Sequence, residues 1–97
     1  MERFGAILRQ RRLAKGWTIE QTARKAGLQK GYLCGIERGL FNPPRARKII
    51  LLARALGIPE KELLLRAVVE RAPSQIRAEL ERRVFGRPGQ RERSKTC

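Results

Sequence analysis

Glycine spacing is the feature that most constrains the fold of this chain. The apolar residues between successive glycines recur at helical rather than strand spacing, as Phe4, Ile7 and Leu8 do at the N-terminus. Glycine adopts the left-handed conformation that ends many helices, so each stretch is predicted to be a helix that stops at a glycine. The glycines concerned are Gly16, Gly27, Gly39 and Gly57. We therefore expect a compact all-α unit.

The C-terminal third is predicted to add two further helices and a tail. A fifth helix follows Pro59, and Ile76, Leu80 and Val84 recur every four residues in a sixth. Residues 86–97 are basic and polar without an apolar anchor, and are expected to be disordered. The expected organisation is a domain over 1–72, a C-terminal helix over 73–85 and a flexible basic tail over 86–97.

Length and hydropathy set the broad class of protein. A chain of 97 residues accommodates one small domain with appendages. It contains no apolar run of about 18 residues, and its charged N-terminus lacks the pattern of a secretory signal. We therefore expect a soluble, cytoplasmic protein without a membrane partner.

The charge balance favours a polyanionic partner. The chain has 23 Lys and Arg against 9 acidic residues, a net charge of +14. Residues 1–66 alone hold 15 basic and 5 acidic side chains, a net +10. Such a concentration is typical of nucleic-acid binding. The alternative is a solvated surface in an arginine-rich proteome.

The missing residue types exclude most catalytic and metal chemistry. The chain has no histidine, and all nine acids are glutamate, so a zinc site with histidine and a Ser/His/Asp triad both lack members. The two cysteines, Cys34 and Cys97, are too far apart in sequence for a Cys-x-x-Cys motif. We expect no enzyme activity, no cofactor and no metal.

Residues 18–38 have the layout of a helix-turn-helix. Thr18 and Gln21 match a capping box that opens a short helix, Gly27 ends it, and a second helix follows over about 29–38. With "LRQRRLAKGWT", "ARKAGL", "YLCGIERG", "NPP" and "LARALGIP" in this order, the sequence resembles the lambda-repressor/Cro-like (XRE) family over residues 4 to about 66. The resemblance implies a five-helix domain whose third helix lies in the major groove of DNA.

The resemblance also implies the roles of individual residues. Arg12 is expected to pair with Glu37 and tie the first helix to the end of the third. The candidates to face bases lie at the start of the second helix and along the third: Ile19, Gln29, Lys30, Gly31, Cys34 and Gly35. Candidates to contact phosphates lie beside this surface or at helix starts: Thr18, Lys25, Tyr32, Arg38, Arg45, Arg47 and Lys48.

Gly31 and Gly35 lie inside the third helix, where each costs about 1 kcal/mol relative to alanine. Three explanations are open. The glycines let the backbone approach DNA closely, with Lys30 and Gln29 making base contacts and Ile19 and Cys34 touching thymine methyl groups. Alternatively, this small face receives a protein partner, or the glycines are tolerated because Leu33 and Ile36 hold the helix by packing.

The function predicted from these features is a sequence-preferring regulator, a repressor, that binds double-stranded DNA as a homodimer. The alternatives are a protein-interaction module on the same fold, such as a polymerase adaptor or an antitoxin, and a nonspecific DNA binder. The resemblance implies that the aliphatic Ile19 favours the protein partner, because some family members whose second helix begins with an aliphatic residue bind proteins instead of DNA. The expected dimer surface is formed by the fifth and sixth helices through Leu65, Val68, Val69, Ile76, Leu80 and Val84.

Overall fold

The structure is a computed structural model that describes residues 3–86. Within this range the chain forms six α-helices and no strand. They are α1 (Phe4–Ala14), α2 (Ile19–Ala26), α3 (Lys30–Glu37), α4 (Ala46–Leu56), α5 (Glu60–Arg71) and α6 (Ser74–Phe85). The all-α prediction is confirmed. The predicted tail lies outside the described residues except for Gly86.

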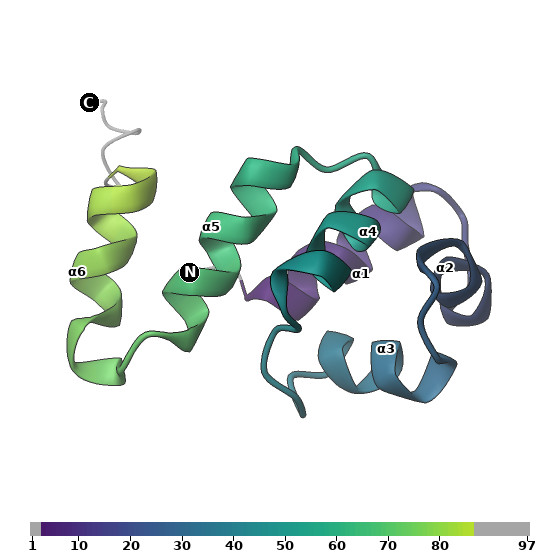
Figure 1. The fold of residues 1–97 in the computed structure, drawn as a ribbon, viewed down its shortest axis with the longest axis horizontal. Helices are drawn as coiled ribbons and strands as arrows, with labels where there is room; N and C mark the ends of the chain where they lie inside the picture. Colours follow the sequence, from purple (N-terminus) through teal and green to yellow (C-terminus); the bar gives the residue numbers. More distant parts are fainter. Residues whose placement is uncertain (1–2, 87–97) are drawn as a thin grey trace.

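Helix α4 is the centre of the packing. It lies against α1, α2 and α5, and Ile49, Leu52, Ala53 and Leu56 are buried along its length at the spacing of one helical face. Figure 1 shows α1 and α4 in the middle of the molecule with α3 below them, α2 at the right-hand end, and α6 beside α5 at the left-hand end. The helix-turn-helix is therefore supported from one side by the domain core.

Glycines end the helices as predicted. Gly27 and Gly57 are left-handed, with φ of 72° at each, and in both cases the following amide donates to a carbonyl of the last helical turn. Gly5 has a different role. A Cβ at Gly5 would stand 2.2 Å from the carbonyl oxygen of Ile36, so this glycine permits the close approach of α1 and α3.

Two polar side chains on α5 tie it to distant segments. Glu70 accepts a hydrogen bond of 2.7 Å from the backbone amide of Phe4 and so caps the start of α1. Arg71 donates to the carbonyl oxygens of Pro43 and Pro44 in the loop before α4. The end of α5 thereby fixes both the N-terminal helix and the loop that follows α3.

Candidate nucleic-acid interface

The start of α2 is fixed by a complete capping box. The Thr18 hydroxyl accepts a hydrogen bond of 3.0 Å from the Gln21 amide, and the Gln21 side chain accepts one of 2.8 Å from the Thr18 amide. Thr22, in the next turn, is fully buried, and its hydroxyl donates to the Thr18 carbonyl oxygen. The helix start is thus well defined at the exposed Thr18, one of the predicted phosphate contacts.

The N-terminus of α3 is open by comparison. Gln29 occupies its N-cap, makes no side-chain cap hydrogen bond and is exposed, as is Lys30 beside it. The side chain of Gln29 is therefore not occupied in capping. Both residues can extend from the helix start toward a ligand, as the base-facing prediction requires.

The two interior glycines of α3 are not equivalent. Leu33 and Ile36 are buried in the core, and the helical period puts Gly31 and Gly35 on the outer side. A Cβ at Gly31 would meet no atom within 4 Å, so this position is open. Gly35 is buried under the ring of Phe41. A Cβ at Gly35 would lie only 2.2 Å from Cε2 of that ring.

The prediction that Gly35 faces bases is therefore wrong. The ring of Phe41, from the loop after α3, already covers it. Sequence reasoning missed Phe41, although an aromatic residue two positions after the helix-ending Gly39 was visible. Cys34, half-buried on the same helix, is a free thiol.

The residues just before α2 and at its start form an apolar surface that two lysines contact. Trp17 and Ile19 are partly buried against the core. The Nζ atoms of Lys15 and Lys25 lie 5.1 and 4.8 Å from the centroid of the Trp17 ring, close enough for a cation–π interaction. Lys25, a predicted phosphate contact, is thus held against the ring.

The first turn of α4 carries a cluster of basic residues. Arg45 is the N-cap, Arg47 and Lys48 follow, all three are exposed, and the turn contains no acidic residue. Cations at the N-terminus of a helix oppose the helix dipole, by about 0.3–1 kcal/mol each. A bound anion would remove this local repulsion, and backbone amides at the same helix end favour one.

A surface hollow connects this basic turn to the start of α3. It has a volume of about 370 Å³ and is lined by Gly27, Leu28, Gln29, Tyr32 and Lys48. The Nζ atom of Lys48 lies 5.2 Å from the centroid of the Tyr32 ring. The structure therefore brings together Gln29, Tyr32 and Lys48, while Arg38 lies exposed at the other end of α3.

Arg12 and Glu37 form a buried ion pair. Nε and Nη2 of Arg12 donate to the two carboxylate oxygens at 2.8 and 3.0 Å, and Nη1 donates to the Trp17 carbonyl oxygen at 2.9 Å. The two side chains are 10% and 4% exposed. The hydrogen bond to Glu37 raises the pKa of Arg12 above its ordinary value, and burial opposes it. The pair is structural and joins α1, the turn before α2 and the end of α3.

Helix α6 folds back on α5. Arg66 lies 3.3 Å from Glu81, and its guanidinium stands 4.0 Å from the centroid of the Phe85 ring. Of the residues predicted to form a dimer surface, Val69 is fully buried within the chain, so its place in that surface is wrong. Val68 and Ile76 remain exposed. Leu65, Leu80 and Val84 are half-buried.

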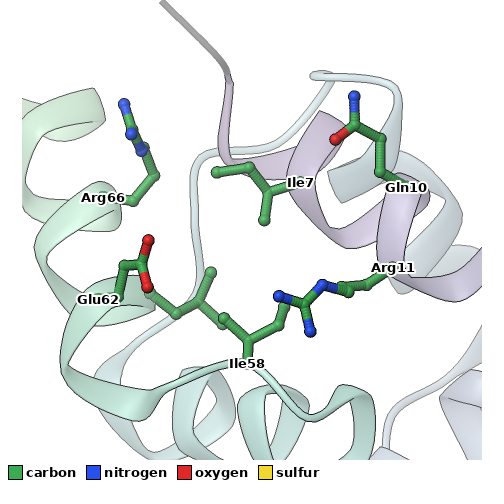
Figure 2. A pocket seen from close by; sticks show the side chains of 7 residues that line it. Ile7, Gln10, Arg11, Ile58, Glu62 and Arg66 are labelled. Atoms are coloured by element: carbon green, nitrogen blue, oxygen red, sulfur yellow. The ribbon is translucent and has the colours of Figure 1, made fainter. Parts of the chain in front are cut away.

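A second hollow lies between α1 and α5 (Figure 2). It has a volume of about 190 Å³, and Ile7, Ile58 and Glu62 are among its lining residues. Arg11 also lines it and donates a hydrogen bond of 3.0 Å to the Gly57 carbonyl oxygen at the end of α4. None of the residues predicted to face DNA lines this hollow.

Residues 3–86 contain no group of three or more side chains suited to hold a metal ion. No helix in the same range is long and apolar enough to cross a membrane.

A short capped helix, a left-handed glycine turn and a second helix packed on the core by one face define the helix-turn-helix class. The sequence model of the helix-turn-helix family HTH_3 matches residues 8–63, and the chain belongs to this family. The resemblance to lambda-repressor/Cro-like proteins is thereby confirmed.

Two known proteins are similar to this chain. A protein of Neisseria meningitidis serogroup B (strain ATCC BAA-335 / MC58), described as a hypothetical transcription factor, is 39% identical over 54 residues, which are 56% of this chain and 50% of that protein. The match thus spans about half the length of that relative. The solved SinR protein/SinI protein complex contains a chain with a TM-score of 0.60 and 26% identity, with coverage of 95% of this chain and 89% of that one.

Proposed function

We propose that the protein is a transcriptional regulator that binds double-stranded DNA with α3 in the major groove. The observation that carries the proposal is the basic first turn of α4, where Arg45, Arg47 and Lys48 face no acidic residue of their own turn. Together with the exposed start of α3 across the hollow, this turn offers cations for a phosphate strand beside a helix for the groove. Membership of the helix-turn-helix family supports the same function.

Base contacts are proposed for α3 with its N-cap and for the first residue of α2. Gln29 and Lys30 supply the hydrogen-bonding groups, and the open position at Gly31 lets the backbone approach base edges. Ile19 and Cys34 are partly exposed and apolar, which suits contact with thymine methyl groups. Phosphates are proposed to be held by Thr18, Lys25, Tyr32, Arg38, Arg45, Arg47 and Lys48.

We further propose that the protein acts as a homodimeric repressor on a partly palindromic site. Val68 and Ile76 are 54% and 49% exposed, and a hollow on α6 is lined by Ile76, Leu80 and two charged residues. A two-fold pair of domains would place two recognition helices about 34 Å apart, one turn of DNA. Analytical ultracentrifugation tests the dimer, because Ile76→Glu should then give a monomer.

Selection of random duplexes by the purified protein, followed by sequencing, tests the function. Recovery of a palindrome supports the regulator, and unselective recovery indicates nonspecific binding. The complementary measurement is salt dependence. Binding that neutralises about six to ten phosphates should weaken by roughly 1,000-fold or more between 50 and 200 mM salt.

The basic turn has a matched control. Replacing Arg47 and Lys48 together with alanine should reduce the slope of log affinity against log salt by about two. Replacing Lys61 and Arg82, which are exposed on α5 and α6, removes the same charge from other helices and should change the slope little. Equal slopes for the two double variants would contradict the proposed placement of the phosphates.

The second candidate is a protein-interaction module. It is favoured by the aliphatic Ile19 at the start of α2, which is only partly covered, and by similarity to a chain solved in a complex of two proteins. Failure to recover any duplex, even at low salt, would favour this candidate over the regulator.

A further inference from the structure

The outer side of α3 carries an aromatic ring that does not belong to the helix. A Cβ at Gly35 would stand 2.2 and 2.5 Å from Cε2 and Cδ2 of Phe41. The ring therefore occupies the space into which a side chain at position 35 would project. It remains 49% exposed, so Phe41 is the side chain that this turn of α3 presents to a ligand.

The backbone after α3 directs Phe41 to this position. Gly39 has a φ of 77°, which turns the chain back, and the Leu40 amide donates a hydrogen bond of 2.9 Å to the Gly35 carbonyl oxygen. The rings of Phe41 and Tyr32 lie with centroids 5.9 Å apart. The ring is thus fixed by a defined turn and by a neighbouring aromatic side chain.

The surroundings of Phe41 favour a nucleic-acid ligand with an apolar group. Tyr32 also carries Lys48 over its ring, at 5.2 Å from the centroid, and Arg38 is exposed at the end of the same helix. Phe41 thus exposes an apolar ring on a surface that also exposes cations, which fits a ligand with phosphates and one apolar group. In the major groove, that apolar contact is the C5-methyl group of thymine.

We propose that Phe41 forms an apolar subsite for a thymine methyl group and determines base preference opposite the second turn of α3. The inference rests on the proposed DNA binding and deepens it. It also explains Gly35. A larger residue there would displace the ring. Glycine at position 35 therefore allows Phe41, a loop residue, to make the base contact that a side chain of the helix would otherwise make.

Thymine-to-deoxyuridine substitution tests the subsite, because it removes the methyl group alone. In a duplex recovered by selection, each thymine is replaced in turn, and affinity is measured by fluorescence anisotropy. For the native protein, the thymine that faces Phe41 in each half-site should lose about fourfold in affinity, the value of one buried methyl group. For Phe41→Ala, the ratio of affinities at that position should fall to about one. Thymines that face Ile19 or Cys34 can lose affinity too, and they are told apart because Phe41→Ala leaves their ratios unchanged.

Two variants separate recognition from folding. Leu40→Ala removes the neighbouring exposed side chain, which is 68% accessible. This variant should keep the native ratio of affinities for the thymine and deoxyuridine duplexes. Phe41→Leu keeps an apolar cover over Gly35 and should keep a ratio above one. Circular dichroism of each variant checks that the helices are intact.

The outcomes distinguish the two proposals. Absence of any duplex binding by the native protein overturns the proposed function. Binding by the native protein with a ratio near one at every thymine, or with the same ratio in Phe41→Ala, overturns the methyl subsite alone. In that case the exposed Phe41 ring would be a candidate contact for a protein partner instead of for DNA.

Discussion

Replacing Glu37 with alanine should destabilise the domain by about 3–5 kcal/mol, the usual cost of breaking a buried ion pair. The variant loses two charge-assisted hydrogen bonds to Arg12, of 2.8 and 3.0 Å, each worth about 1.5–3 kcal/mol. It also leaves a guanidinium that is only 10% exposed with one remaining acceptor, the Trp17 carbonyl oxygen. The loss is a large part of the 5–15 kcal/mol typical of a domain.

Thermal and urea unfolding followed by circular dichroism measure this cost. For a domain of this size, about 1 kcal/mol shifts Tm by roughly 4–8 °C, so Glu37→Ala should lower Tm by about 12 °C or more. The raised pKa of Arg12 means that its stabilising contribution is present below the ordinary arginine pKa and is lost only as pH rises through the folded-state value. Arg12 itself should therefore add no pH dependence between pH 6 and 8.

A double-mutant cycle measures the interaction energy between Arg12 and Glu37 separately from the cost of leaving either charge buried alone. Arg12→Met and Glu37→Leu should each be strongly destabilising, because each leaves one charge buried alone. The double variant should recover to within about 1–2 kcal/mol of the native protein, since apolar replacements of buried pairs are often neutral. A cost below about 1 kcal/mol for Glu37→Ala would refute the reasoning. So would a double variant whose free-energy cost equals the sum of the two single costs.

Three further changes test other contacts. Gly5→Ala should destabilise by about 2 kcal/mol or more in urea unfolding, because its Cβ would stand 2.2 Å from the Ile36 carbonyl oxygen; an unchanged midpoint would contradict the close approach of α1 and α3. Thr18→Ala should cost about 1 kcal/mol by loss of the capping box, whereas Thr18→Ser should be nearly neutral. Arg66→Met, which removes the pair with Glu81, should speed hydrogen exchange in α6 more than in α1–α4; uniform exchange would show that α6 does not depend on this contact.

Much of the fold follows from local properties of the chain. The left-handed glycines at 27 and 57 end helices, and the capping box at Thr18 and Gln21 opens one, because these signals act within a few residues. The pairing of Arg12 with Glu37 was predicted only by family resemblance. Their separation of 25 positions leaves no local trace from which contact can be deduced.

The sequence by itself determined an all-α chain with a helix-turn-helix, because helix periodicity and termination are local. Only the tertiary structure decided which side of each element meets another. Val69 is fully buried rather than available to a partner, because α5 is covered from more than one direction. Gly35 lies beneath Phe41, because the turn at Gly39 brings the chain back across α3. Such contacts depend on the path of the backbone in three dimensions, which helical spacing does not specify.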